Sequence, residues 1–284
     1  MHRLPRSLLL PLIALLPVLG VLAGTGSAAN ASPAGGSNAA RAAAIAKAAI
    51  KGLDIGQHGT DQRTGITSQI AGLTQVQSSN WSGYADTGSN FSKVAASWKE
   101  PSASSCGDTV TLAAFWVGID GYSSDSVEQD GTLIECYYGT NYQFSWWEMY
   151  PTNDIQTVGE SVAGGDSITA SVVRSGDSYT LAVTDSAHTA NSFSTTQSCS
   201  DCANSSAEWI AEAPSGEDGV YPLEDFGSWT ASSATVTEGS TAGVISSFTD
   251  DEITMVDSSG NVKAQPSALT SGGNGFSVAW ERSS

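Results

Sequence analysis

The sequence predicts an all-β domain, and three observations support this prediction. Short apolar or alternating runs follow one another from residue 75 to residue 284. Clusters of Ser, Thr, Asn, Asp and Gly separate these runs, as they separate strands in sheet proteins. No amphipathic helix pattern lies between them. Ten or more strands in about 210 residues indicate two packed antiparallel sheets or a barrel.

The individual strands are expected where apolar or alternating residues run for four to eleven positions. Ser175-Gly176-Asp177 marks a hairpin turn between two of them. The expected strands are 79–85, 91–99, 109–119, 132–138, 142–150, 167–174, 178–185, 207–212, 227–237, 253–256 and 275–281.

The first 29 residues have the pattern of a secretory signal peptide. Arg3 and Arg6 precede an apolar run over residues 8–23, and small residues at positions 27–29 suit a cleavage site. The run is broken by two prolines and is shorter than the ~20 apolar residues of a membrane-spanning helix. We therefore expect a secreted, extracellular protein without a membrane anchor.

Residues 30–74 differ in composition from the rest and are expected to form a pro-region or linker. Residues 30–38 are rich in Ala, Gly, Ser and Pro, which is typical of a flexible linker. Residues 39–51 are strong helix formers that end before Gly52, and residues 56–68 are polar and expected to be irregular. A short helical pro-region is favoured, with a plain N-terminal linker as the alternative.

The charge of the expected mature part is strongly negative. Residues 75–284 contain five Lys or Arg residues and 27 of the 29 acids, which gives a net charge of 5 − 27 = −22. This excess excludes nucleic-acid partners, because phosphate binding needs a basic patch. It also increases self-repulsion at neutral pH, which protonation of carboxylates relieves. A protein that works in acid fits this charge, as does a generic secreted protein.

The net charge of the expected pro-region has the opposite sign. Its four basic residues against two acids give about +2. We therefore expect it to dock on the acidic domain at neutral pH, to act there as an inhibitor, and to be released as carboxylates protonate. The charged residues are Arg41, Lys47, Lys51, Arg63, Asp54 and Asp61.

The four cysteines, Cys106, Cys136, Cys199 and Cys202, are expected to form disulfides, because an even number outside the cell favours pairing. Three connectivities are open. We favour Cys106–Cys136, which would brace the loop of Gln129, and a local Cys199–Cys202 link. Zinc at the CxxC stretch is disfavoured, since no second CxxC or His pair completes four ligands. No metal or other cofactor is expected.

The scarcity of histidine limits the catalytic mechanisms that the protein could use. His2 and His58 lie in segments expected to be removed, which leaves His188, in a turn-like stretch where it is expected to be solvated. A Ser-His-Asp or Cys-His arrangement needs a His beside the nucleophile. The GxSxG and HExxH motifs are also absent from the sequence. A hydrolase of this composition would work with carboxylates and amides.

One stretch, residues 114–131, brings such groups together. An apolar strand with Trp116 runs into the reversal around Asp120, and the chain returns through Gln129 between two acids, Glu128 and Asp130. The arrangement fits a functional site at the mouth of a hairpin. It equally fits an ordinary Gly-rich hairpin with solvated acids.

Two further runs place carboxylates beside apolar side chains by strand alternation. An acid flanked by aromatic rings on a sheet face has a shifted pKa and can hold a ligand. Each Glu taken alone also fits an outward, solvated strand residue. The two expected faces consist of Glu208, Ile210 and Glu212, and of Phe144, Trp146, Glu148 and Tyr150.

Six motifs in order resemble the glutamic peptidases, the eqolisin family, and its bacterial members more than its fungal ones. The likeness covers residues 75–281, and the order of the motifs makes it specific. The motifs are SNWSGY at 79–84, VAASW at 94–98 with Pro101, FWVGIDG at 115–121, EQDG at 128–131, WWEMYP at 146–151 and AEWIAE at 207–212.

This resemblance implies a sandwich of two large antiparallel sheets, a concanavalin-like jelly roll, with a peptide-binding groove on its concave face. It implies an acid endopeptidase that uses a catalytic Gln and Glu with an activated water, without a covalent intermediate. A monomer is our default expectation for a secreted hydrolase and does not come from the resemblance. Residues 213–223 depart from the fungal sequences, which puts subsite specificity in doubt. The matching catalytic positions are Gln129, in the loop after WVGIDG, and Glu212; those that line or support the site are Trp81, Trp116, Asp120, Trp146 and Glu148.

Two other functions remain open from the residues. A glycoside hydrolase could use Glu148 and Glu212 as paired carboxylates. A non-catalytic lectin-like or adhesion module could bind calcium through acid-rich loops such as residues 250–252. Insensitivity of activity to a chelator would separate the peptidase from the calcium-binding module.

Overall fold

The computed structural model describes residues 63–70, 73–216 and 218–284. The predicted signal peptide and the predicted helix at 39–51 lie outside these residues. The regular secondary structure of the described chain consists of strands and two 3₁₀ turns, η1 (Thr189–Asn191) and η2 (Ile245–Ser247), which confirms the all-β prediction. No helix in this part of the chain is long and apolar enough to cross a membrane.

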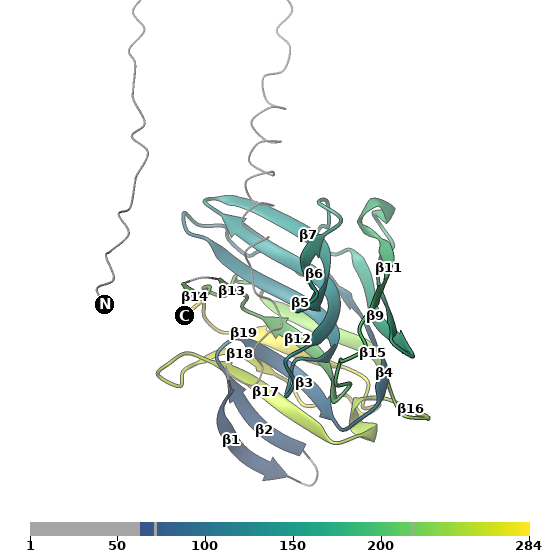
Figure 1. Ribbon diagram of the computed structural model, residues 1–284. Coiled ribbons are helices and arrows are strands. Elements are labelled where there is room, and N and C mark those ends of the chain that lie inside the picture. Colours follow the sequence, from purple (N-terminus) through teal and green to yellow (C-terminus); the bar gives the residue numbers. More distant parts are fainter. Residues whose placement is uncertain (1–62, 71–72, 217) are drawn as a thin grey trace, which may run out of the picture.

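The strands form two layers that face each other (Figure 1). The first sheet has the order β1-β2-β17-β3-β12-β5-β6-β7-β8, and the second has the order β16-β15-β4-β9-β10-β11. The first comprises β1 (Arg63–Ile70), β2 (Leu73–Ser78), β3 (Trp81–Thr87), β5 (Thr111–Asp120), β6 (Val127–Tyr137), β7 (Thr140–Tyr150), β8 (Asn153–Thr157), β12 (Ser206–Glu212) and β17 (Asp250–Val256). The second comprises β4 (Phe91–Lys99), β9 (Ser167–Ser175), β10 (Ser178–Asp185), β11 (Phe193–Ser198), β15 (Ser228–Glu238) and β16 (Thr241–Gly243).

Strand β15 belongs to both layers. Its first half, 228–231, pairs with β19 (Phe276–Trp280), which joins β17 of the first sheet through β18 (Val262–Pro266). Its second half pairs with β4 of the second sheet. A small hairpin, β13 (Ser215–Gly216) with β14 (Gly219–Val220), follows β12. The named strands pair antiparallel, except that β2 runs parallel to β17.

Several strands differ from their predicted bounds. β4 and β10 match the prediction, whereas β6 begins five residues earlier than expected, at Val127. Its polar start resembles a loop in sequence, but it pairs with β5 and β7 on both sides. Residues 63–68, expected to be irregular, lie in β1, and the expected boundary between residues 74 and 75 falls inside β2.

Two hydrophobic clusters lie on opposite faces of the first sheet. The larger fills the space between the sheets and contains residues of both, such as Phe115, Trp209 and Leu181. The smaller lies on the other face of the first sheet and includes Trp116 and Ile210. We call this second surface the tryptophan face, because it carries Trp81, Trp116 and Trp146. The three tryptophans and the residues between them lie on five neighbouring strands, β3-β12-β5-β6-β7.

Both favoured disulfides are present, Cys106–Cys136 and Cys199–Cys202. The predicted role of the first is wrong. Cys136 lies near the end of β6, whereas Gln129 lies near its start, so the disulfide ties the far end of this strand to the loop before β5. Cysteine side chains of the described residues are all paired in this way.

Candidate active site

Gln129 and Glu148 face each other on neighbouring strands of the tryptophan face. The register aligns Gly118 of β5, Gln129 of β6 and Glu148 of β7 in one row across the sheet. The side-chain Nε2 of Gln129 donates a hydrogen bond of 2.7 Å to Oε2 of Glu148. Both side chains are buried. The amide is therefore held in one orientation by the carboxylate opposite it. Gln129 lies in a strand, not in the loop that the resemblance implied.

Glu212 is the last residue of β12 and lies two rows from Gln129. It pairs with Trp81 of β3 on one side and Ala114 of β5 on the other. The indole Nε1 of Trp116 donates a 2.9 Å hydrogen bond to Oε2 of Glu212. Asn80 Nδ2 donates a 3.2 Å hydrogen bond to Oε1. These donors offset part of the cost of burying the carboxylate.

Asn80 is a site residue that the sequence analysis did not identify. Its own Oδ1 accepts a hydrogen bond from Ser78 Oγ at 3.0 Å, which directs Nδ2 toward Glu212. Its backbone carbonyl accepts from Ala213 N at 2.8 Å, so the β2–β3 connection is tied to the end of β12. The SNWSGY motif contained this residue, but nothing in strand alternation indicated that a residue before β3 would reach Glu212.

Trp116 lies in the row between Gln129 and Glu212, aligned with Gly131 of β6 and Trp146 of β7. The residue that pairs with Trp116 on β6, Gly131, must be a glycine. A Cβ at Gly131 would lie 2.0 Å from the Phe115 carbonyl oxygen and 2.8 Å from the Trp116 Cα. The rings of Trp116 and Trp81 pack in a T-shaped arrangement, with centroids 5.0 Å apart and ring planes at 77°. Trp116 thus forms the buried floor between the two candidate catalytic residues.

Trp81 and Trp146 lie on the tryptophan face together with Trp116. They contribute apolar contacts there. Both rings are fully buried. Neither indole N–H has a hydrogen-bond partner among the residues that the structure describes. Of the three tryptophans on this face, Trp116 is therefore the one that holds a candidate catalytic carboxylate.

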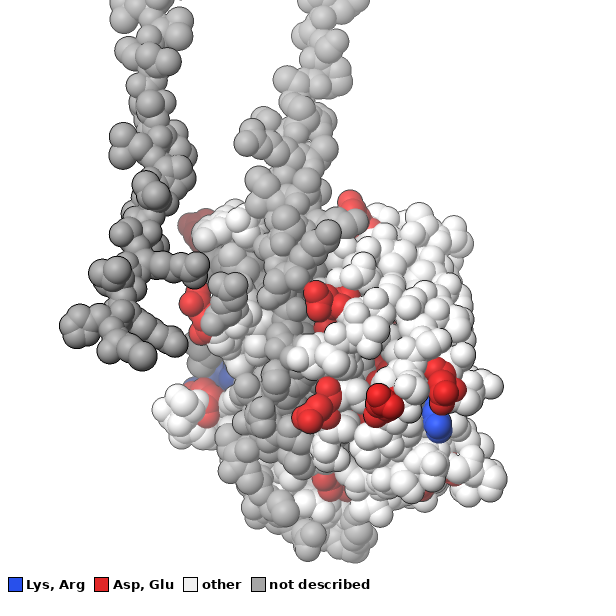
Figure 2. Space-filling view, viewed as in Figure 1, with Lys and Arg blue, Asp and Glu red and all other residues white. Residues whose placement is uncertain are grey.

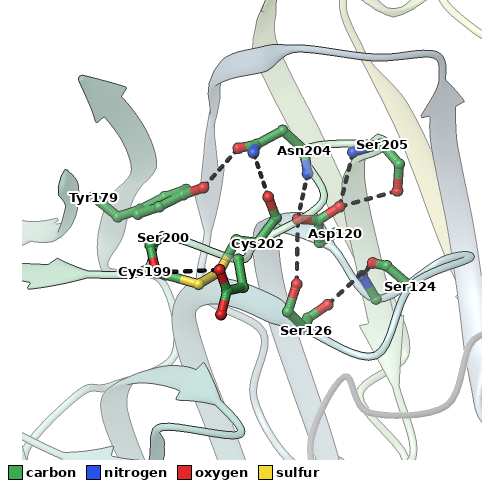
Figure 3. The surroundings of a disulfide bond; sticks show 11 residues. Asp120, Ser124, Ser126, Tyr179, Cys199, Ser200, Cys202, Asn204 and Ser205 are labelled. Carbon is green, nitrogen blue, oxygen red and sulfur yellow. Dashed lines mark hydrogen bonds between the residues drawn. A yellow bond between two sulfur atoms is a disulfide. The ribbon is translucent and has the colours of Figure 1, made fainter. Parts of the chain in front are cut away.

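Asp120 supports the site from the end of β5 and does not point its carboxylate at Gln129 or Glu212. It adopts a positive φ of 71° and accepts hydrogen bonds from Asn204 N at 2.6 Å and Ser205 N at 2.8 Å (Figure 3). Ser126 Oγ donates to the same carboxylate at 3.4 Å. The carboxylate therefore ties the β5–β6 hairpin to the start of β12.

The two acids beside Gln129 point away from the tryptophan face. Because side chains alternate along β6, Glu128 and Asp130 lie on the inter-sheet side, where both are fully buried. Burial raises the pKa of each carboxyl well above its ordinary value, and nearby Asp120 adds to the shift at Glu128. Glu128 and Asp130 are therefore neutral in acid solution and are not the solvated residues of an ordinary hairpin.

Glu208 lies on the tryptophan face, where the register places it beside Gly118 in the row of Gln129. Burial raises the pKa of its carboxyl well above the ordinary value.

Other buried carboxyls show the same shift. Burial raises the pKa of Glu100 to about 8, although hydrogen bonds from Thr132 and Trp98 oppose the change. Burial and the neighbouring acids raise the pKa of Asp86 to about 9, and burial raises that of Glu135 to about 7.

On the molecular surface, acids clearly outnumber Lys and Arg on the face that Figure 2 shows.

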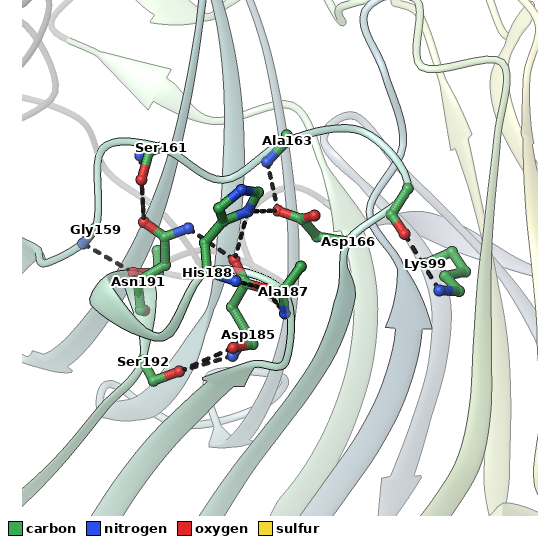
Figure 4. Close-up of polar contacts among 12 residues, drawn as sticks. Lys99, Gly159, Ser161, Ala163, Asp166, Asp185, Ala187, His188, Asn191 and Ser192 are labelled. Atoms are coloured by element: carbon green, nitrogen blue, oxygen red, sulfur yellow. Dashed lines mark hydrogen bonds and ion pairs between the residues drawn. The ribbon is translucent and has the colours of Figure 1, made fainter.

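His188 lies on the second sheet, in the β10–β11 connection. Its side chain is 49% exposed, and its Nδ1 lies 2.9 Å from Asp166 Oδ2, so it is paired rather than simply solvated (Figure 4). The hydrogen bond to Asp166 raises the pKa of the imidazole. Asp166, Asp185 and His188 could hold a metal ion by residue type and spacing. None of the three lies on the tryptophan face.

The predicted calcium loop is wrong. Residues 250–252 lie in strand β17. Asp251 accepts a hydrogen bond from Tyr122, and Glu252 accepts one from Tyr84 Oη at 2.9 Å. These acids are part of the sheet and its hydrogen-bond pattern, which removes the observation that favoured a calcium-dependent module.

Comparison with known proteins finds relatives of this chain. Residues 79–280 match the peptidase A4 family. Aspergillopepsin-2 of Aspergillus niger is 28% identical over 195 residues, covering 60% of this chain and 69% of that protein. Scytalidopepsin B of Scytalidium lignicola is 33% identical over 149 residues, covering 51% of this chain and 55% of that protein.

Solved structures show the same fold. A scytalido-glutamic peptidase bound to a transition-state analogue inhibitor superposes with a TM-score of 0.61 at 23% identity, covering 72% of this chain and 98% of that chain. The aspergilloglutamic peptidase of Aspergillus niger superposes with a TM-score of 0.51 at 27% identity, covering 60% of this chain and 99% of that chain. The two-layer sandwich implied by the six motifs is therefore confirmed.

Proposed function

Because this chain belongs to the peptidase A4 family, the glutamic peptidases or eqolisins, and is thus a peptide-bond hydrolase, we propose that it is an acid endopeptidase with a Gln129–Glu212 dyad. One observation carries this assignment. Glu212 and Gln129 lie on the same buried face of one sheet, on either side of Trp116, and each is oriented by a hydrogen bond to a neighbouring strand.

Glu212 is suited to act as the general base. Trp116 donates to one carboxylate oxygen and Asn80 to the other. An ionised carboxylate offers about four acceptor sites, and in the proposed reaction one of them accepts a hydrogen bond from a water molecule. The carboxylate takes a proton from this water as the water oxygen attacks the scissile carbonyl carbon.

Gln129 is suited to stabilise the oxyanion that forms. Its Nε2 carries two N–H donors, and one of them is directed to Glu148. The other donor serves the carbonyl oxygen as negative charge develops on it, an interaction typically worth about 3–4 kcal/mol. Glu148 acts as the positioning residue for the amide.

Breakdown of the tetrahedral intermediate returns the proton. Glu212, protonated in the first step, donates that proton to the leaving amine nitrogen as the C–N bond breaks. The products are a carboxylic acid and an amine, and Glu212 is again a carboxylate. The sequence of steps consumes one water and forms no covalent bond to the protein.

Substitution of the dyad tests this assignment. Glu212→Gln and Gln129→Ala should each abolish most cleavage of a denatured protein substrate in acid, without loss of fold by circular dichroism. Glu100→Gln is the matched control, because Glu100 is also a buried acid whose neutral form burial favours, and its carboxyl contacts Trp98 and Thr132 rather than the dyad. Full activity of Glu212→Gln, or equal loss in Glu100→Gln, would refute the dyad. A chelator should leave the wild-type rate unchanged.

Secretion, a monomeric state and inhibition by the pro-region complete the proposal. The expected pro-region is basic and the domain is acidic, so attraction between them should weaken as carboxylates protonate. At neutral pH the full chain should cleave more slowly than protein trimmed before residue 75, and the two should converge in acid. Equal rates at neutral pH would refute the inhibitory role. The trimming site must be varied, because residue 75 lies inside β2.

A further inference from the structure

Glu208 is a carboxyl group of the tryptophan face that the Gln129–Glu212 dyad does not use. It lies on β12, on the same side of this strand as Glu212, because side chains alternate along a strand. The register places Glu208 opposite Gly118 of β5, and Gly118 opposite Gln129 of β6. Only a residue without a side chain therefore separates Glu208 from Gln129 in this row. Two strand spacings put their Cα atoms about 10 Å apart.

The ring of Trp116 forms the floor of the space between these two side chains. A Cβ added at Gly118 would lie 2.9 Å from Cζ3 of Trp116 and 3.3 Å from Cβ of Gln129. The six-membered ring of the indole therefore covers Gly118. The nitrogen of the same indole donates to Glu212. One side chain thus extends from the row of Gln129 and Glu208 to the candidate base, so a peptide bond lying on this ring is near all three groups.

Glu208 differs from its neighbours in having no hydrogen bond. Its side chain is fully buried, and neither of its carboxyl oxygens has a hydrogen-bond partner among the residues that the structure describes. The carboxylate of Glu212, by contrast, accepts two hydrogen bonds, and Gln129 is bonded to Glu148. Buried polar groups are nearly always hydrogen-bonded, because loss of water without a new partner costs free energy. The unpaired carboxyl therefore indicates a partner that the substrate supplies.

The surroundings keep Glu208 in its acid form. Burial is the largest cause of a pKa well above the ordinary value, and the charges of Asp120, Glu128 and Asp86 add to it. The nearby hydroxyl of Ser206 opposes the shift. In acid solution Glu208 therefore carries an O–H group, which can donate a hydrogen bond, whereas an ionised carboxylate only accepts.

We propose that Glu208 is a second catalytic donor to the carbonyl oxygen of the scissile bond, opposite Gln129 and across Gly118. The inference rests on the proposed function of the Gln129–Glu212 dyad. The O–H of Glu208 and an N–H of Gln129 stabilise the oxygen from two sides as negative charge develops on it. The proton stays on Glu208 throughout, so Glu212 still carries the proton from the water to the leaving amine.

The two acids of β12 must then hold opposite protonation states. Glu212 acts as an ionised base, and Glu208 acts as a neutral donor. Raising the pH through the pKa of Glu212 activates the base, whereas raising it through the pKa of Glu208 removes the donor. The pH dependence of kcat should therefore be bell-shaped, with Glu208 responsible for the alkaline limb.

Two substitutions distinguish a donor from a structural acid. Glu208→Gln keeps the shape of the side chain and an N–H donor, so kcat in acid should stay within about tenfold of wild type. Glu208→Leu removes the donor, so kcat should fall about 10²- to 10³-fold, with a smaller change in KM. The assay is steady-state hydrolysis of one peptide by the full chain, and circular dichroism checks the fold of each variant.

The pH profile of Glu208→Gln gives a readout that a structural role would not change. An amide does not ionise in this range, so the alkaline limb of kcat should move up by about one pH unit or more. Glu100→Gln, which replaces a buried acid in contact with Trp98 and Thr132, should leave this limb in place. A limb set by another acid of the tryptophan face would also stay in place in Glu208→Gln. The acids in question are Glu148, Glu212 and Asp251.

Three results would overturn the second donor: wild-type kcat in Glu208→Leu, an equal loss in Glu208→Gln and Glu208→Leu, or an unmoved alkaline limb in Glu208→Gln. If Glu208→Leu fails to fold, the pH profile of Glu208→Gln decides alone. The dyad is tested separately, because Glu212→Gln should be inactive under conditions in which Glu208→Gln cleaves. If Glu212→Gln cleaves, the proposed function falls. If it is inactive and Glu208→Leu cleaves like wild type, only the second donor falls.

Discussion

Trp116 donates its indole N–H to the carboxylate of Glu212 over 2.9 Å, so the floor of the tryptophan face fixes the candidate base. Trp116→Phe keeps an aromatic ring but removes this donor. A hydrogen bond to a charged group is worth about 1.5–3 kcal/mol, so kcat/KM should fall about ten- to hundredfold while the fold is kept. Steady-state peptide hydrolysis with a thermal melt measures both effects.

Trp81→Phe is the control for this prediction. Trp81 packs against Trp116 in a T-shaped arrangement, but its N–H has no hydrogen-bond partner among the described residues. Its replacement should lower stability and reduce kcat/KM less than Trp116→Phe does. If both variants lose activity equally, ring packing rather than the hydrogen bond explains the role of Trp116.

Glu148 should act through Gln129. In Glu148→Leu, the amide of Gln129 loses the acceptor that orients it, so kcat should fall about tenfold with a smaller change in KM. Glu148→Gln retains an acceptor oxygen and should recover part of that loss. Measurement of kcat and KM for both variants checks this. A two-carboxylate glycosidase would instead lose activity completely in Glu148→Gln and would cleave no peptide.

Stability should decline as pH rises, because buried acids bind protons more tightly in the folded state. For Glu100, burial raises the folded pKa from 4.5 to about 8, with nearby Asp166 and Asp185 adding to the shift. Its stabilising contribution is therefore complete below the unfolded pKa and is lost as pH rises through about 8. Urea midpoints at several pH values from about 3 to 8 measure the decline.

Glu100→Gln tests the assignment of this pH dependence. Glutamine stays neutral, and it can still bond Thr132 and Trp98, which now contact the carboxyl. The variant should lose less stability than wild type between about pH 4.5 and 8. A pH dependence as steep as that of wild type would assign the decline to other acids, such as Asp86, whose folded pKa is about 9.

Gly131 should not tolerate a side chain. An added Cβ would lie 2.0 Å from the Phe115 carbonyl oxygen, inside the backbone pairing of β5 and β6. Gly131→Ala should therefore destabilise the protein by about 1–3 kcal/mol and displace Trp116. Gly107→Ala, where no atom lies within 4 Å of the added Cβ, should change stability by less than about 0.5 kcal/mol. Chemical unfolding of both variants measures these two changes in the free energy of unfolding.

Strand alternation within the sequence predicted the tryptophan face well. The grouping of Phe144, Trp146 and Glu148, and that of Ile210 with Glu212, needs only the two-residue period of a strand. The same rule assigns Glu128 and Asp130 to the face opposite Gln129. The hairpin interpretation missed this, because it treated residues 127–131 as a polar loop rather than as strand.

Contacts between distant segments could not be predicted in this way. Asn80 reaches Glu212 across 132 positions of the chain, and no local pattern encodes that approach. The parallel pairing of β2 with β17 likewise depends on how the whole sheet closes.

The shared strand β15 has a consequence for how the molecule opens. Its residues 228–231 pair with β19 of the first sheet and its later residues pair with β4 of the second. Separating the two layers therefore requires breaking the backbone hydrogen bonds of this strand. Neither layer can then unfold while the other stays intact. Amide protons deep in both layers should exchange with solvent at one common, global free energy of opening.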